Sequence, residues 1–253
     1  MAIFYVRRNA LKHIVSYSGG KDSTAMLLKM IEKKMPIDEI VYCEVMATPI
    51  IGAEYPEMYE YLDKVDEYLM KNIGKKITRI KPDVSFEQQF YTKKKRGKYK
   101  GKIYGFPWNL GAWCNSRLKI ATLDKYFKNQ DKEYISYIGI AYDEPKRLAR
   151  LDRNEKAPLA EWEMPESDCL EYIKEKGLYN PLYDKLKRLG CWFCVKQSLD
   201  SLRIIRKDYP ELWNLLLKWQ LDSEVIFRTD YSIQQLEEKF NKEENNKIIN
   251  KSI

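Results

Sequence analysis

Short hydrophobic runs alternate with amphipathic stretches along the first 140 residues of the chain. Four of the runs have the length of buried strands, and they lie at residues 13–17, 39–45, 76–80 and 134–140. Between them, residues 25–34 and 57–73 repeat apolar side chains at helical spacing. Strands that alternate with helices predict an α/β fold, a doubly wound and mostly parallel sheet with helices on both faces. Ligands of such sheets bind beyond the carboxyl ends of the strands.

The chain beyond Pro210 has a different pattern, with apolar side chains at helical spacing and no strand. We expect helices at residues 211–227 and 233–240 that pack on the core, and a polar end at residues 241–253 that frays. A chain of 253 residues suffices for one domain with an appendage. We therefore predict a main domain at residues 1–200 and a helical C-terminal extension at residues 201–253.

Composition narrows the class of protein. A hydrophobic content of 44% with 13% aromatic residues is typical of a globular chain rather than a disordered one. No run of 18 apolar residues occurs, and residues 1–8 lack the small-residue site of a cleavable signal. We therefore expect a soluble, cytoplasmic protein with no membrane partner. The net charge of +8 favours anionic partners without choosing between a nucleotide and a nucleic acid.

The first predicted strand ends in a short polar sequence that predicts a phosphate site. Its residues are Ser18, Gly19, Gly20, Lys21, Asp22 and Ser23, and a predicted helix follows. The two glycines let the backbone turn sharply and bring its N–H groups close to a ligand, while the helix directs the positive end of its dipole to the same point. Lys21 adds a full charge, and the serine hydroxyls add donors. The spacing is not that of a Walker A loop, which disfavours an ordinary kinase or GTPase.

Residues 82–113 interrupt the alternation of predicted strands and helices with a strongly basic insertion. Seven positive charges fall within residues 93–102, with Tyr99 and Tyr104 among or beside them. One interpretation is a solvated, mobile loop, because charge runs are commonly just that. The other is a lid or track over a polyphosphate or a nucleic-acid backbone, since lysine and arginine contact phosphates and tyrosine stacks on bases. The sequence is compatible with both.

The cysteines form the second candidate site. Their odd number in a chain without a secretory signal argues against a disulfide framework, and they are Cys43, Cys114, Cys169, Cys191 and Cys194. The C-x-x-C pair, Cys191 and Cys194, follows a turn, whereas thioredoxin-like redox pairs lie at a helix start. Zinc would need a fourth ligand, and the sole histidine, His13, lies on a predicted strand.

Three thiolates, from Cys114, Cys191 and Cys194, suit an iron–sulfur cluster with one iron left open. Zinc, or three thiols without a metal, remains an alternative on the sequence alone. We expect the other two cysteines, Cys43 and Cys169, to pack in the core as small hydrophobic side chains.

Several stretches resemble known families. Residues 18–23 are similar to the PP-loop of the ATP pyrophosphatase superfamily, whose members hold the β,γ-pyrophosphate of ATP and transfer AMP to an acceptor. A wider set of motifs, spanning roughly residues 12 to 200, resembles the phosphoadenosine phosphosulfate (PAPS) and adenosine phosphosulfate (APS) reductase family. The motifs are Glu54-Tyr55-Pro56-Glu57, Trp113-Cys114 with Leu118-Lys119, Gly139-Ile140-Ala141 with Glu144 and Arg147, Trp162-Glu163, Asn180-Pro181-Leu182-Tyr183 and Gly190-Cys191.

The resemblance implies a Rossmann-like fold of the adenine nucleotide α-hydrolase type, with residues 1–200 as the nucleotide-binding domain. ATP would bind with Mg²⁺, and Asp22 would either help hold the metal or complement the helix dipole. Arg147 and Lys119 are candidate phosphate contacts. The implied site residues are Lys21, Asp22 and Arg147 for catalysis, residues 18–23 with Lys119 and Gly139 for the nucleotide, and Cys114, Cys191 and Cys194 for a [4Fe–4S] cluster.

Two of the departures of the chain from the reductases concern cysteines. APS reductases carry Cys-Cys before the distant C-x-x-C pair, whereas this chain has Trp113-Cys114, so one cluster ligand is missing. The reductases also end in a Glu-Cys-Gly-Leu-His tail whose cysteine attacks the substrate sulfur, and no cysteine follows Cys194 here. A PP-loop with a three-cysteine site resembles ATP-dependent thiolation enzymes instead.

We therefore predict an ATP-dependent sulfurtransferase that adenylates an acceptor and uses the cluster in sulfur transfer, with a sulfur donor protein as a candidate partner. One alternative is a sulfonucleotide reductase that takes PAPS or APS. The other is an accessory protein that retains the nucleotide fold, binds nucleic acid through residues 93–102 and catalyses nothing.

Overall fold

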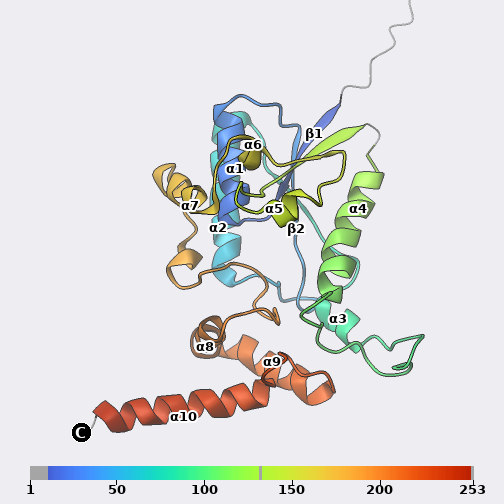
Figure 1. Cartoon of the computed structure of the whole chain (residues 1–253), viewed down its shortest axis with the longest axis vertical. Coiled ribbons are helices and arrows are strands. Elements are labelled where there is room, and N and C mark those ends of the chain that lie inside the picture. Colours follow the sequence, from blue (N-terminus) through green and yellow to red (C-terminus); the bar gives the residue numbers. More distant parts are fainter. Residues whose placement is uncertain (1–10, 131–132, 252–253) are drawn as a thin grey trace, which may run out of the picture. The chain divides into compact units, whose positions relative to one another are not determined.

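The computed structural model describes residues 11–130 and 133–251, with side chains up to residue 246 (Figure 1). Residues 1–8, on which the prediction of a cytoplasmic protein partly rests, lie outside the described residues, as does the very end of the segment expected to fray. Across the described ranges, every helix is too short or too polar to cross a membrane.

The predicted parallel sheet is confirmed. Its strands are β1 (Lys12–Tyr17), β2 (Glu39–Cys43), β3 (Ile77–Ile80), β4 (Tyr134–Ile138) and β5 (Glu155–Lys156). Within the described residues they form one sheet in the order β3-β2-β1-β4-β5, with every pair of neighbours parallel. The central strand β1 buries Ile14 and Val15 completely, as expected for a parallel strand covered on both faces.

The register of the sheet determines which loops meet. Ser16 of β1 lies opposite Val41 of β2 and Ile138 of β4. The carboxyl ends of these three strands therefore lie at the same edge, and the loops that follow β1 and β4 are neighbours.

Helices lie on both sides of this sheet. The helices α1 (Lys21–Glu32) and α2 (Pro56–Ile73) follow β1 and β2, whereas α4 (Ala121–Lys128) precedes β4. Figure 1 shows α1 and α2 on one side of the strands and α4 on the other. The handedness rule explains this, because the chain steps from β1 to β3 in one direction and returns to β4 in the opposite one, and right-handed crossovers then lie on opposite faces.

Short helices complete the edge of the sheet at which β1 ends. They are α5 (Pro145–Leu148), α6 (Pro158–Glu161), α7 (Glu166–Glu175) and a 3₁₀ turn at Pro181–Asp184. The helix α7 lies against α1, where Tyr172 donates a hydrogen bond of 2.6 Å to Glu32 and Lys176 forms an ion pair of 3.1 Å with the same carboxylate.

The chain forms two compact units, each assembled from three separate segments. The first unit comprises the described residues up to 44, residues 56–81 and residues 122–183, and it contains the sheet. The second unit comprises residues 45–55, residues 82–121 and the chain from 184 onward. The predicted boundary at residue 200 stays a prediction.

The second unit is helical around an aromatic core. Its helices are α3 (Phe86–Tyr91), a π-helix at Asn115–Ile120, α8 (Leu199–Asp208), α9 (Pro210–Asp222) and α10 (Ile233–Lys251). Trp192 and Trp219 are fully buried and stack with ring centroids 5.6 Å apart. Trp192 donates a hydrogen bond of 2.9 Å to the carbonyl of Gly52, and Trp219 donates one of 3.0 Å to Glu87.

The C-terminal helix is longer than the sequence predicts, because α10 runs to Lys251 rather than ending at Phe240. Two arginines of α8 stabilise the extra turns. Arg203 forms ion pairs with Glu243, and Arg206 with Glu237 and Glu244, at 2.8 to 2.9 Å. The polar end that we expected to fray is therefore an ion-paired helix through the residues whose side chains are described.

These ion pairs predict a pH dependence for the packing of α10. Hydrogen bonds from Arg206 lower the pKa of Glu237, and those from Arg203 lower the pKa of Glu243 to about 2, from an ordinary value of 4.5. Depressed carboxylate pKa values stabilise the fold above the ordinary value, and this stability is lost as the pH falls from about 4.5 toward 2. We expect the fluorescence of Trp213, which donates a hydrogen bond to Glu237, to change over this window. A variant with both glutamates changed to glutamine should be flat there, and an identical transition in that variant would contradict the assignment.

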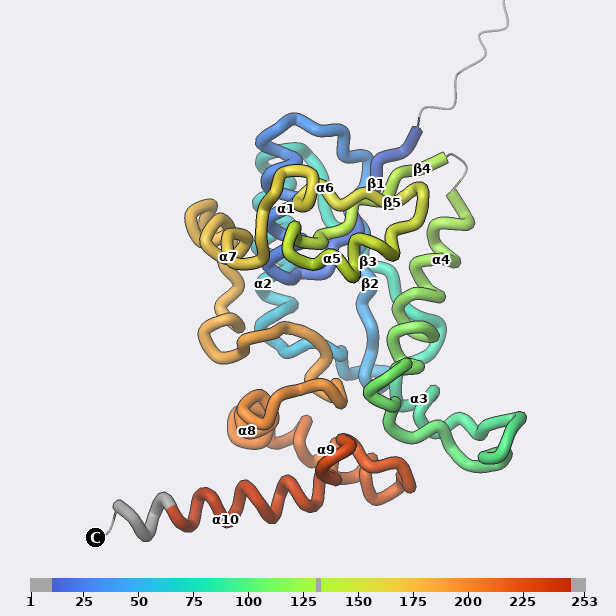
Figure 2. Tube along the Cα trace, viewed as in Figure 1, coloured from blue at the N-terminus to red at the C-terminus, as the bar shows by residue number. Residues whose placement is uncertain are grey.

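Part of the basic insertion forms a short hairpin. Lys93 pairs antiparallel with Ile103, and the amide of Lys94 donates to the carbonyl of Lys102 at 2.8 Å. Gly97 and Gly101 supply the positive φ angles of its turn, 81° and 86°. Figure 2 shows this segment as the green excursion after α3. We call residues 93–103 the basic hairpin.

Candidate functional site

The polar sequence after β1 forms a tight turn that leads directly into α1. Gly19 has a φ of +73°, a left-handed conformation that favours glycine, and a Cβ there would lie 2.9 Å from the sulfur of Met58. Gly20 is the N-cap of α1 and accepts the first helical hydrogen bond, from the amide of Thr24 at 3.0 Å. The amides of Asp22 and Ser23 therefore lie in the first turn, where they have no acceptor within the helix. Glycines and the N–H groups of a helix start therefore meet at this point, which is what a phosphate site requires.

The hydroxyl groups of the turn hold its shape. Ser18 Oγ and Ser23 Oγ lie 2.9 Å apart, and Ser23 also donates to the carbonyl of Gly20 at 3.0 Å. Below them, Thr24 Oγ1 lies 2.9 Å from Tyr17 Oη and 3.1 Å from Tyr61 Oη. The turn is thus preorganised by its own side chains.

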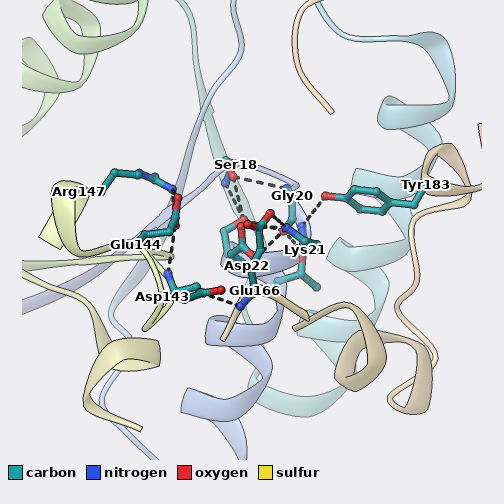
Figure 3. A network of polar contacts seen from close by, with 12 residues as sticks. Ser18, Gly20, Lys21, Asp22, Asp143, Glu144, Arg147, Glu166 and Tyr183 are labelled. Atoms are coloured by element: carbon teal, nitrogen blue, oxygen red, sulfur yellow. Dashed lines mark hydrogen bonds and ion pairs between the residues drawn. The ribbon is translucent and has the colours of Figure 1, made fainter. Parts of the chain in front are cut away.

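Lys21 is held at the helix start by two carboxylates and a phenol (Figure 3). Its Nζ forms ion pairs with Glu166 and with Asp22 Oδ1, the latter at 3.2 Å, while its backbone amide donates to Tyr183 Oη at 2.8 Å. Burial lowers the pKa of the Lys21 ammonium, but the hydrogen bond to Glu166 and the two carboxylate charges outweigh burial and raise it. Lys21 therefore keeps its positive charge at neutral pH.

Asp22 is a carboxylate of this site with one oxygen that lacks a hydrogen bond among the described residues. Its Oδ1 is buried and accepts no hydrogen bond within the described part of the chain, although the Lys21 charge lies nearby. Burial raises the pKa of Asp22, the Lys21 charge opposes this, and the charges of Glu166 and Glu144 add to it. A cation at this place would relieve the concentration of negative charge.

The end of β4 closes the other side of the turn. A Cβ on Gly139 would lie 2.6 Å from the amide nitrogen of Ser23, so the backbones of β4 and α1 approach as closely as glycine allows. Beyond it, Glu144 accepts from Arg147 at 2.6 Å and from the amide of Ala141 at 3.3 Å. Arg147, predicted to be catalytic, is half exposed and paired with Glu144 on this side of the loop.

This close approach predicts a large effect for a small substitution. In Gly139→Ala the new methyl group meets backbone atoms, which cannot rotate away, so we expect a loss of about 1–3 kcal/mol in the free energy of unfolding. Nucleotide binding should weaken as well, because the amide of Ser23 is displaced. Urea unfolding and a nucleotide titration measure the two effects.

Gly74→Ala is the matched control, because Gly74 has a strained φ of +64° but open space around its Cβ position. It should lose stability through strain and keep nucleotide affinity. Equal nucleotide affinity in both variants would argue against the close approach at Gly139.

The three cysteines predicted to hold a cluster belong together to the second unit. Cys114 lies just before the π-helix, and Cys191 and Cys194 flank the buried Trp192. Burial raises the pKa of Cys191 and raises that of Cys114 to about 11, and the thiols add to each other's shifts. All three are therefore close enough to interact electrostatically.

Lys119, expected to contact a phosphate, is placed beside these cysteines. Burial raises the pKa of Glu54, and the Lys119 charge opposes that shift. The same lysine opposes the rise that burial and the charge of Glu54 cause in the pKa of Cys191. The structure thus groups Lys119 with Glu54 and the cysteines of the second unit, whereas the PP-loop-like turn belongs to the first unit.

Among the residues described, no three His, Cys, Asp or Glu side chains converge closely enough to hold a metal ion. The donor chemistry nevertheless suits soft metals, since thiolates are soft ligands and the three cysteines belong to one unit.

Two site residues carried no assigned role at the sequence level. Glu166 pairs with Lys21 from the first turn of α7, 145 positions away, and its only local signal is the preceding Pro165. Tyr183 was part of a family motif, which could have flagged it. Cys43 and Cys169 are buried as expected, but Cys169 also lies beside Asp22, and burial followed by that carboxylate raises its thiol pKa to about 12.

Comparisons with known proteins identify the family of the chain. The family model of the phosphoadenosine phosphosulfate reductase domain matches residues 12–197. The chain belongs to this family.

Individual relatives are more distant. The chain is 28% identical over 211 residues to the "Uncharacterized nin region protein ORF290" of Escherichia phage lambda, covering 78% of this chain and 70% of that protein. Among solved structures, it is similar to a U34-tRNA thiolase NcsA from Methanococcus maripaludis with its [4Fe–4S] cluster, at 16% identity and a TM-score of 0.43. That alignment covers 86% of this chain and 73% of the thiolase.

Proposed function

We propose that this protein binds ATP at the turn of residues 18–23, transfers AMP to an acceptor, and uses its three-cysteine site in the sulfur transfer that follows. One observation carries the proposal: a charged lysine stands at the start of α1 beside a glycine turn, and the first-turn amides of Asp22 and Ser23 have no acceptor within the helix. This arrangement suits a pyrophosphate group, which needs donors and positive charge at one point.

The residues of the turn account for the first half-reaction. Lys21, the amides of the turn and the N-terminus of α1 would hold the β- and γ-phosphates and stabilise the charge that develops on pyrophosphate as it leaves. An acceptor oxygen attacks the α-phosphorus, the bond between the α-phosphorus and the bridging oxygen breaks, and pyrophosphate departs. Asp22, which has a buried oxygen without a hydrogen bond from any described residue, and Glu166 would supply carboxylates for the Mg²⁺ that accompanies ATP.

Binding requires a change of partners at Lys21. Its ammonium now pairs with Asp22 and Glu166. Phosphate oxygens would take over from Glu166, whose side chain is half exposed and thus free to turn toward solvent or a metal ion. Arg147 could exchange Glu144 for a phosphate in the same way, because the pair is at the surface.

The second unit would contribute the sulfur chemistry. Cys114, Cys191 and Cys194 are the residues that would hold a [4Fe–4S] cluster, and three separated thiols suit a cluster, in which each iron takes its own cysteine, better than one zinc ion. When bound, such a cluster would supply one iron with an open position for sulfur. A sulfide-level sulfur then forms a bond to the activated atom of the acceptor, AMP leaves with the electron pair of the broken bond, and no oxidant or reductant is needed.

A second candidate function is sulfonucleotide reduction, and membership of the PAPS reductase domain family favours it. The loop and Lys21 would then hold the phosphates of PAPS or APS. The reaction would need a thiol nucleophile other than the one that the family uses.

Product analysis separates the two functions. With ATP and Mg²⁺, the proposed function gives AMP and pyrophosphate in equal amounts, and neither ADP nor phosphate. With PAPS or APS and a thiol reductant, the second candidate gives sulfite. Sulfite release without AMP formation from ATP would overturn the proposal, and turnover of neither substrate would leave a non-catalytic nucleic-acid-binding protein as the remaining interpretation.

A further inference from the structure

A large cavity lies in the second unit. Its volume is about 1050 Å³, at the upper end of the range of small-molecule pockets. Residues of the basic hairpin line one part of it, and residues 222–229, at the end of α9 and beyond, line another. Residues 107–110, with Val195 and Lys196 just after the C-x-x-C pair, complete the lining.

Two aromatic side chains of this cavity are exposed to solvent. Trp108 is 69% exposed and Tyr99 is 52% exposed. The Trp108 ring stacks on no aromatic ring or cation within the described residues. A tryptophan normally buries most of its surface, so a bare indole at the wall of a cavity marks a contact with something that is not part of the chain.

The charges of the lining are predominantly positive. It includes four cationic side chains and two carboxylates. Glu224 pairs with Lys102, and Asp222 accepts a hydrogen bond of 2.5 Å from Tyr91, so both carboxylates are engaged. Lys94 and Lys196 have no ion-pair partner among the described side chains, and Lys94 lies 5.4 Å from the centre of the Tyr99 ring.

Close contacts hold the walls of the cavity in place. Gly105, just beyond the hairpin, has a φ of +65°, and a Cβ there would lie 2.4 Å from Ser223 Oγ, so the two walls touch at their base. On the other side, Phe227 packs edge-on against Phe106 at 5.1 Å, and its amide donates to Gln220 at 2.8 Å. The exposed rings and lysines are therefore presented on a fixed frame.

From these features we infer that the cavity binds a single-stranded segment of nucleic acid, with a base stacked on Trp108 and phosphates paired with Lys94 and the neighbouring lysines. A bare indole face beside lysines without a carboxylate partner is a combination that single strands recognise, because every base has a π-face and every linkage a negative charge. A duplex hides its base faces, so unpaired nucleotides fit this cavity better.

The cavity also adjoins the cysteine site. Lys196, which lines the cavity, lies two positions after Cys194 in the sequence. The claim that this nucleic acid accepts sulfur rests on the proposed function. The claim that it binds in the cavity does not.

Binding of labelled oligonucleotides to the full chain tests the inference. Short oligouridylate and oligothymidylate are the probes, with a duplex of the same length and an oligoglutamate peptide of the same charge as competitors. We expect a single strand to bind, and the relative affinity of the two probes assigns the site to RNA or to DNA. Trp108→Ala should weaken binding about 5- to 150-fold, and Trp108→Phe, which keeps a stacking face, should restore most of it.

Lys94→Ala should flatten the slope of log affinity against log salt by about one unit. Lys71→Ala, an exposed lysine on α2 of the first unit, is the matched control and should leave the slope unchanged. Both target side chains are substantially exposed or solvated, so circular dichroism should show an intact fold.

Three results would overturn the inference: single-strand affinity unaffected by Trp108→Ala, preference for the duplex, or displacement of the oligonucleotide by the acidic peptide at equal charge, which would point to a protein partner. ATP cleavage is measured in the same preparations. Cleavage without oligonucleotide binding sinks the cavity inference and leaves the proposed function standing. Trp108-dependent binding without cleavage supports the cavity site and removes the proposed function.

Discussion

Replacing Lys21 by alanine is expected to lower ATP-dependent formation of AMP by about 10²- to 10³-fold, the usual cost of removing one donor from a preorganised charged site. The loss has two causes. The phosphates lose their charged partner, and Asp22 and Glu166, now paired with Lys21, are left facing the incoming anion. Release of AMP and pyrophosphate over time measures the effect.

Lys29→Ala is the matched control for this substitution. Lys29 lies on the same helix, eight positions later, with its ammonium 5.3 Å from the centre of the Tyr172 ring. It should keep the turnover of the unchanged protein. If Lys21→Ala cleaved ATP as fast as Lys29→Ala, the turn would not be the site of the reaction.

Removing one cysteine of the trio is expected to abolish metal loading altogether. After anaerobic purification, we expect roughly four irons with matching acid-labile sulfide per chain, and neither in Cys191→Ala, because a cluster with only two protein ligands is not retained. The measurement is iron, sulfide and zinc per chain, and it does not depend on any activity.

Cys43→Ala provides the comparison, since Cys43 is a buried cysteine of β2 in the first unit. It should load as much iron as the unchanged protein. Zinc in place of iron, or the same iron content in both variants, would rule out a cluster at this site and leave the cysteines with a structural role.

The sheet was predictable because its signals are local. A run such as residues 13–17 is apolar over the length of a strand, and alternation with helices then implies parallel pairing. The strand β5 was missed because it has only two residues, Glu155 and Lys156, neither of them apolar. The extra turns of α10 were missed for a different reason: they depend on arginines of α8 roughly 40 positions away, and no pattern within residues 241–253 records those partners.

The site residues also divide into those that local sequence signals predict and those that depend on contacts between distant parts of the chain. The turn itself could be predicted from six consecutive residues. The family motif also assigned Gly139 to the nucleotide site, and the structure places it against the backbone of Ser23. Glu166 and Tyr183 reach Lys21 across 145 and 162 positions, respectively, so only the folded chain brings them to it. The position of Lys119 was harder still to predict. A lysine that contacts a phosphate and a lysine that lies beside cysteines look the same in the sequence.

The interleaving of the two units has a consequence for how the chain reaches its native state. The second unit needs residues 45–55 from before α2 and helices from the last third of the chain, and the bond from Trp192 to Gly52 alone closes a loop of 140 positions. Contacts of such sequence separation must wait for loop closure, which makes folding slow. On the ribosome, Phe86 and its aromatic neighbours emerge well before Trp219, their partner in the core. Nascent chains therefore expose an aromatic surface until synthesis is nearly complete, and a chain cut near residue 200 keeps that surface for good.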